Sequence, residues 1–384
     1  MYPLASFLFE PGVYLMKSKT EFRKKIRTVL IITLCWTLFA CISFISQYFF
    51  IYDLIALKKL SGSFSFWNEL TGTFVFGIFG GLAGGWLLVF KMGSRYRGRS
   101  FAYGIINAGL LFIVTYVGLA AAGLFIIDFV YFSFNENFSS SLSKSVDNVL
   151  FNILSPSFFI NVFLFGFFVS ITQFMLQVND KFGPGILWKF ITGKYYHPRQ
   201  EERIFMFLDL RSSTTIAEKM SSKKFFGLLK EIYNDITEPI LNSQGEIYQY
   251  VGDEVIITWP VEKGLAGNNC LLCFFRIGQA LEQRKEHYNT VYDLLPAFKA
   301  GLHIGEATVG EIGVIKKDIV YSGDVLNTTS RIQGECNNNN VNLLLSHDLL
   351  KRMQLNGEYQ EMAIGEIPLK GKKEKVALYT IKVK

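Results

Sequence analysis

Hydrophobic residues are distributed differently in the two halves of the chain. Up to about Val178 long stretches carry no charged residue, whereas from Asn179 onward Lys, Arg, Asp and Glu recur every few residues. An uncharged apolar run of about 20 residues can cross a bilayer as a helix, and interspersed charge is typical of a water-exposed domain. The pattern therefore predicts an α-helical membrane domain over residues 1–178 and a water-exposed domain after it.

Four apolar runs are long enough to cross a membrane, at residues 26–50, 71–90, 101–127 and 158–178. The first is too long for a cleaved signal peptide and no small-residue cleavage site follows it, so we expect it to remain as an anchor. Lys and Arg gather before the first run and between the second and third. Because such residues resist translocation, we expect an integral protein of the plasma (inner) membrane with both termini and the second domain cytoplasmic.

The second apolar run contains glycines at spacings that let helix backbones approach closely: Gly77, Gly80, Gly81, Gly84 and Gly85. Packing within one chain and packing between two chains are both consistent with this pattern.

The second half of the chain alternates strand and helix patterns. Residues 179–202 mix Gly, Pro, aromatic and charged residues, which is typical of a linker. The pattern then predicts a strand at 204–210, helical periodicity to about 242, a hairpin at 246–252 and 255–259, a helix at 268–288, strands at 298–304 and 307–312, and a helix at 324–335. This order predicts an α/β sandwich of ferredoxin-like type over residues 203–384.

The formal net charge of +7 is concentrated beside the hydrophobic runs. This placement favours membrane lipid over nucleic acid as the partner of the positive charge. The five cysteines are an odd number without the spacing of a secreted scaffold, so we expect reduced thiols. Cys270 and Cys273 lie in an apolar helical pattern, which favours core packing over metal binding.

Two carboxylates occupy positions at which a strand can aim them at an open edge. Asp209 ends a hydrophobic strand in FMFLDLRSSTT, and Asp253 lies at the tip of the hairpin in YQYVGDEVIITW. Taken singly, each is also an ordinary turn or cap residue. Together they can hold two divalent ions, which would activate a hydroxyl group and neutralise phosphate charge.

Three further segments carry groups suited to a nucleotide. The backbone N–H groups in the first turn of a helix have no partner within the helix and can bind terminal phosphates. In the segment after Asp209 these groups belong to Arg211, Ser212, Ser213, Thr214 and Thr215. In GDVLNTTSR, Asn327 and Arg331 lie four residues apart on one helix face, where Asn can orient a ribose and Arg can stabilise phosphoryl charge. LKGKKEK supplies Lys370 and Lys372 for leaving phosphates.

In their order, these motifs resemble the catalytic domain of class III adenylate and guanylate cyclases over about residues 203–383. The resemblance implies an enzyme that converts a nucleoside triphosphate into a 3′,5′-cyclic monophosphate and pyrophosphate. It also implies a homodimer with two equivalent sites, because in that family the metal carboxylates come from one subunit and the Asn and Arg from the other.

The resemblance assigns a role to each matching residue. Asp209 and Asp253, helped by the Leu210 carbonyl, would bind two Mg²⁺ or Mn²⁺ ions per active site. Asn327 and Arg331 would act on the ribose and the α-phosphate.

The sequence departs from the family at the two positions that usually contact the purine, which here are Gln249 and Val320. Gln249 can pair with the adenine 6-amino group and a ring nitrogen, while neither position offers the carboxylate that suits guanine. We therefore expect ATP to be preferred over GTP, with a guanylate cyclase as the alternative.

Two other classes of protein share some of these features. Gly252, Asp253 and Glu254 resemble part of the diguanylate cyclase hairpin, but Val251 and Val255 replace the Gly and Phe of that signature. A degenerate cyclase domain that only binds nucleotide would be expected to lack some of the catalytic set, and all of that set is present.

Overall fold

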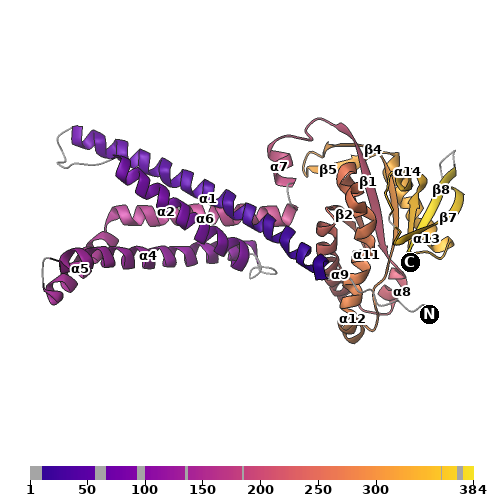
Figure 1. The fold of residues 1–384 in the computed structure, drawn as a ribbon, viewed down its shortest axis with the longest axis horizontal. Coiled ribbons are helices and arrows are strands. Elements are labelled where there is room, and N and C mark those ends of the chain that lie inside the picture. Colours follow the sequence, from indigo (N-terminus) through magenta and orange to yellow (C-terminus); the bar gives the residue numbers. More distant parts are fainter. Residues whose placement is uncertain are drawn as a thin grey trace. The chain divides into compact units, whose positions relative to one another are not determined.

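The computed structural model describes residues 11–56, 66–92, 100–134, 137–183, 186–355, 357–369 and 375–384. They fall into two compact units, Met1–Trp188 and Lys189–Lys384. The first unit is helical and the second is built around one β-sheet (Figure 1).

The first unit consists of long helices: α1 (Pro11–Ala56), α2 (Phe66–Trp86) continuing into the π-helical η1 (Leu87–Met92), α4 (Phe101–Ser133), α5 (Phe138–Ile153) and α6 (Pro156–Phe182). A short helix, α7 (Ile186–Ile191), crosses the division between the units. Four segments are long and apolar enough to span a membrane: Lys25–Phe49, Leu70–Met92, Phe101–Ser133 and Phe158–Asn179. They confirm the four apolar runs predicted from sequence.

Glycines of α2 pack directly against α1. A Cβ atom added to Gly81 would lie 2.7 Å from the Cα atom of Thr33, and one added to Gly77 would lie 3.0 Å from that of Thr37. Since these distances leave no room for a side chain, the glycines permit close helix contact within one chain.

The second unit contains a single sheet with the strand order β2-β3-β1-β4-β6-β8-β7, and β5 pairs with β4 off this path. The strands are β1 (Arg199–Leu210), β2 (Glu246–Val251), β3 (Glu254–Pro260), β4 (Phe298–Ile312), β5 (Asp318–Ser322), β6 (Leu343–Ser346), β7 (Tyr359–Pro368) and β8 (Lys375–Val383). The helical elements are α8 (Ser213–Glu218), α9 (Ser222–Asn242), α10 (Val261–Leu265), η2 (Ala266–Asn268), α11 (Asn269–Gln283), α12 (Lys285–Tyr292), α13 (Asp324–Asn338) and α14 (His347–Leu350).

The order β2-β3-β1-β4 is that of a ferredoxin-like sheet, with α9 connecting β1 to β2 and α11 connecting β3 to β4. This confirms the predicted fold class. Helices α9 and α11 lie side by side and cover one face of the sheet (Figure 1).

Side chains of β1 alternate between two cores. Ile204, Met206 and Leu208 are fully buried toward α9 and α11, in a core that also contains Cys270 and Cys273. The latter two are therefore core residues, as predicted. Phe205, Phe207, Ile256, Tyr321 and Val325 belong to a smaller cluster, called here the second core. Because successive residues of a strand point to opposite faces, both faces of β1 are buried.

The two strands predicted at 298–304 and 307–312 form one continuous strand, β4. The prediction of a break was wrong, because β4 pairs with β1 without interruption and Gly305 lies opposite Arg203 in that register. Gly305 serves packing, since a Cβ atom there would lie 3.1 Å from Val325 Cγ2. The chain instead reverses after Gly313, whose φ is +105°, to form β5. Strand β1 begins at Arg199, inside the segment predicted as a linker.

Candidate active site

Asp209 and Asp253 are brought together at one end of the sheet. Asp209 is the penultimate residue of β1, and Asp253 lies in the tight turn between β2 and β3. Strands β1 and β3 pair antiparallel, with Asp209 opposite Glu254. Gly252 gives the turn a left-handed residue with a φ of +62°. The register of β1 therefore sets the two carboxylates side by side.

This end of the sheet carries an excess of negative charge. Burial raises the pKa of Asp209 above its usual range, Lys299 opposes that shift, and the nearby Asp253 carboxylate adds to it. Burial, with further contributions from Asp209 and Asp253, raises the pKa of Glu254 to about 7. Neighbouring carboxylates repel when ionised, so the arrangement favours a bound cation.

Two residues that sequence reasoning missed contact Asp209. Lys299 Nζ lies 3.1 Å from Asp209 Oδ2, and Gln333 Nε2 donates a hydrogen bond of 3.0 Å to the same oxygen. Lys299 lies directly opposite Asp209 in the pairing of β1 with β4. Only this long-range register identifies it, because no local motif marks position 299.

The turn that carries Asp253 is held from outside the sheet. Tyr233 on α9 donates a hydrogen bond of 2.6 Å from its hydroxyl to the Gly252 carbonyl oxygen. Its ring centroid lies 4.6 Å from that of Tyr250 on β2. This helix–turn contact, also missed in the sequence, restrains the position of the second carboxylate.

The donor set fits a magnesium or manganese ion that also binds a substrate. Across the described ranges, no group of three or more His, Cys, Asp or Glu side chains is arranged to hold a metal. Mg²⁺, however, usually binds through one or two carboxylates together with water and substrate phosphates, rather than in an all-protein cage. Asp209, Asp253 and the Leu210 carbonyl at the end of β1 match that chemistry.

The predicted phosphate segment follows β1 directly. Ser212 adopts a left-handed conformation with a φ of 56° and precedes α8, whose first turn contains Ser213, Thr214 and Thr215. The backbone N–H of Arg211 donates to the Ala297 carbonyl oxygen at 2.8 Å, so it is already engaged. The segment therefore follows Asp209 directly, and the Arg211 N–H group is not free to bind a phosphate as the sequence predicted.

Asn327 and Arg331 lie on α13, which packs closely on β4. A Cβ atom added to Gly301 of β4 would lie 2.7 Å from the Thr329 carbonyl oxygen of α13. Asn327 is exposed and Arg331 is half-buried. Among the described residues neither side chain has a hydrogen-bond or ion-pair partner, so no direct polar contact joins them to the carboxylate pair of the same chain.

Two further predicted residues lie on strands β2 and β5. Gln249 is exposed on β2 and Val320 is half-buried on β5. Lys370 and Lys372 lie outside the described residues.

Comparison with known proteins identifies related chains. Residues 195–383 match the model of the adenylate and guanylate cyclase catalytic domain. "Adenylate cyclase 2" of Rhizobium meliloti (strain 1021) is 32% identical over 280 residues, covering 73% of each chain. "Adenylate cyclase" of Anabaena cylindrica is 23% identical over 187 residues, 46% of this chain and 36% of that one. A solved bacterial light-regulated adenylyl cyclase has a TM-score of 0.48 at 22% identity, over 56% of this chain and 64% of that one.

The carboxylate pair leads to a prediction about metal binding. Asp253→Asn should remove most of the stabilisation that Mn²⁺ gives, which for a ligand at about 100 times its Kd is about 2.7 kcal/mol. Without metal, the variant should be as stable as the wild type or slightly more so, because a like-charge contact is removed. Thermal unfolding of the detergent-solubilised full chain across a Mn²⁺ titration measures both effects.

Asp348→Asn is the matched control, since Asp348 is an exposed carboxylate on α14 that pairs with Lys351. It should retain the full Mn²⁺ effect. An equal rise in Tm with Mn²⁺ in wild type and Asp253→Asn would contradict the assignment of Asp253 as a metal ligand.

Proposed function

The chain belongs to the class III adenylate and guanylate cyclase family, and from that premise we propose that it converts ATP into 3′,5′-cyclic AMP and pyrophosphate. The observation that carries the proposal is the proximity of the Asp209 and Asp253 carboxyl groups at one end of a ferredoxin-like sheet. The reaction requires attack of the ribose 3′-oxygen on the α-phosphorus, with pyrophosphate leaving. Both events concentrate negative charge, so the site must supply positive charge.

Each chain carries the groups that the reaction requires. Asp209 and Asp253 would hold two Mg²⁺ or Mn²⁺ ions, which neutralise phosphate charge and favour ionisation of the attacking hydroxyl. Asn327 would orient the ribose and Arg331 would stabilise charge on the α-phosphate. Residues 211–215, with Lys370 or Lys372, would bind the terminal phosphates.

The active site in this proposal is shared between two chains. Its support is that Asn327 and Arg331 make no polar contact with the carboxylates of their own chain in the described structure. A two-fold homodimer would place one set opposite the other and so produce two equivalent sites.

The preference for ATP rests on Gln249 and on the curated relative, named an adenylate cyclase, that covers 73% of the chain. An amide side chain can accept from the adenine 6-amino group and donate to a ring nitrogen. The side chain of Val320 has no hydrogen-bonding group and can contribute only to the fit of the base, so discrimination against GTP should be modest.

The apolar helices anchor the enzyme in the membrane in this proposal, with both termini and the catalytic domain cytoplasmic. The support is the Lys and Arg residues before the first span and between the second and third.

Purified full chain with Mn²⁺ should turn over ATP faster than GTP and give cyclic AMP, identified by mass.

Gln249→Glu should shift the ratio of ATP turnover to GTP turnover toward GTP by about tenfold. A carboxylate accepts from the guanine N1 and 2-amino groups, and one such bond contributes about 1 to 3 kcal/mol. Gln283→Glu, which adds the same charge at an exposed position on α11, should leave the ratio unchanged. Faster wild-type turnover of GTP would reject the base assignment.

Asp209→Asn and Arg331→Ala should each be inactive alone, yet an equal mixture should recover about one quarter of wild-type activity. Half of randomly formed dimers would be mixed, and each mixed dimer would contain one intact site of two. Mixing Asp209→Asn with Asp253→Asn is the control, because both changes lie in the same half-site and every site stays defective. Inactive mixtures with proven subunit exchange would exclude a shared site.

A cysteine at Ser139, an exposed position of α5, should react with a membrane-impermeant thiol reagent in intact cells. One at Ser94, in the positively charged segment that lies outside the described residues, should react only after lysis. The unmodified chain, with its five cysteines, sets the background. The reverse labelling pattern would overturn the orientation.

A further inference from the structure

Strand β2 contains a β-bulge immediately before Gln249. In its pairing with β3, Ile247 lies opposite Ile257 and Gln249 lies opposite Ile256, so Tyr248 is an extra residue. A bulge interrupts the alternation of faces. Since residues directly opposite in an antiparallel pair share a face, Gln249 lies on the face of Ile256, which belongs to the second core. Tyr248 packs against the same core. The bulge thus places two successive side chains on one face.

Tyr248 also connects two strands that are not neighbours in the sheet. Its hydroxyl accepts a hydrogen bond of 3.2 Å from the backbone N–H of Tyr321 on β5. The two rings meet edge to face, with centroids 5.1 Å apart. Strand β2 pairs with β3, while β5 pairs with β4. Because Val320 is adjacent to Tyr321, this contact links the two strands that carry the predicted base contacts, Gln249 and Val320.

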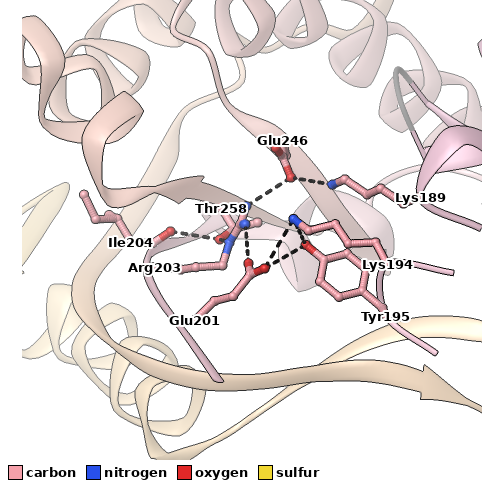
Figure 2. A network of polar contacts seen from close by, with 8 residues as sticks. All are labelled: Lys189, Lys194, Tyr195, Glu201, Arg203, Ile204, Glu246 and Thr258. Atoms are coloured by element: carbon pink, nitrogen blue, oxygen red, sulfur yellow. Dashed lines mark hydrogen bonds and ion pairs between the residues drawn. The ribbon is translucent and has the colours of Figure 1, made fainter. Parts of the chain in front are cut away.

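The ring of Tyr321 in turn makes a cation–π contact with the buried guanidinium group of Arg203. The guanidinium carbon of Arg203 lies 5.0 Å from the Tyr321 ring centroid, and the Arg203 side chain is only 3% exposed. Arg203 forms ion pairs with Glu201 at 3.1 Å and Glu246 at 3.0 Å (Figure 2). Its Nε donates to Thr258 Oγ1 at 3.0 Å. A buried guanidinium with this many partners has a fixed position, so it is a rigid support for the Tyr321 ring.

The same carboxylates hold the segment that precedes β1. Lys189 Nζ lies 3.2 Å from Glu246, Lys194 Nζ lies 3.4 Å from Glu201, and the Tyr195 hydroxyl donates to Glu201 at 3.1 Å. Figure 2 shows these side chains converging on Glu201 and Glu246 around Arg203. Arg203 and its partners are therefore restrained by β1, β2, β3 and the segment that precedes β1.

We propose that Tyr248 is a positioning residue for base recognition, which presents Gln249 on the second-core face and holds it at a fixed distance from the strand of Val320. The inference rests on the proposed function, because it takes Gln249 and Val320 as the residues that contact the purine. Tyr248 acts through these neighbours and through its hydrogen bond to Tyr321.

Tyr248→Phe removes the hydroxyl and keeps the ring, so the fold and the ring contact with Tyr321 should persist while β2 and β5 lose the hydrogen bond that joins them. The expected result is a KM for ATP raised about three- to tenfold, a kcat within about twofold of wild type, and an ATP-to-GTP ratio closer to one. Loss of binding common to ground state and transition state raises KM without lowering kcat. Steady-state kinetics with both nucleotides measure all three quantities.

Tyr288→Phe is the matched control. Tyr288 donates a hydrogen bond of 2.6 Å to Asp235 and lies 5.6 Å from the Arg284 guanidinium, in the core on the other side of the sheet. Tyr288→Phe removes a hydrogen-bonded hydroxyl group, as Tyr248→Phe does, but at a position away from the strands that carry Gln249 and Val320. Its effect should appear in Tm and leave KM and the nucleotide ratio unchanged.

A double variant tests whether Tyr248 acts through Gln249. In a Gln249→Ala background, Tyr248→Phe should produce little further change in the ratio, because there is no longer an amide to position. Independent effects that multiply would overturn the proposal, as would a Tyr248→Phe variant that behaves like Tyr288→Phe. Wild-type protein without cyclase activity would overturn the proposed function itself, whereas active wild type with unaltered selectivity in Tyr248→Phe would overturn only this inference.

Discussion

The pairing of β1 on both sides is the constraint on which the candidate site depends. Seven residues of β1 pair in register with β3, from Arg203 to Asp209, and twelve pair with β4. This double register places Asp209 beside the turn of Asp253 and opposite Lys299. A slip by one residue would exchange the two faces of β1 and bury the carboxylate among apolar side chains, so burial of both faces fixes the register and with it the site.

The carboxyl groups at this end of the sheet are held together at a cost in stability. Asp209 meets one cation and one amide, but it also faces two carboxylates on β3 and its preceding turn. Like charges held this close destabilise a protein that lacks a counter-ion. Tyr233 holds the turn in place through Gly252, which keeps the carboxylates together despite their repulsion. A bound divalent ion would reduce that repulsion, so metal binding at this site would raise the folding stability.

Local patterns in the sequence predicted the four apolar spans, strand β1, the β2–β3 hairpin and the position of both carboxylates, because each depends on periodicity or on a short turn. Features that depend on distant pairing were missed. The sequence pattern predicted separate strands at 298–304 and 307–312, yet β4 continues through Gly305, which makes room for Val325 of α13. Lys299 and Gln333 reach Asp209 only through the register of β4 and the packing of α13. The bulge at Tyr248 could not be predicted either, because the YQY sequence fits ordinary alternation.

The polar network around Arg203 is better explained by the fixed positions that it gives to nearby side chains than by a contribution to folding stability. Burying a guanidinium removes it from water, and the ion pairs that compensate rarely give a net gain over well-packed apolar residues. Glu201, Glu246 and Thr258 nevertheless fix its location, and the Tyr321 ring lies against it. Apolar side chains could fill the same volume but would not define one orientation for the ring through directional contacts. Among the described strands β5 pairs with β4 alone, and it takes a second restraint from this network and from Tyr248. The polar network beside the second core, together with Tyr248, therefore restrains where β5 lies relative to β2.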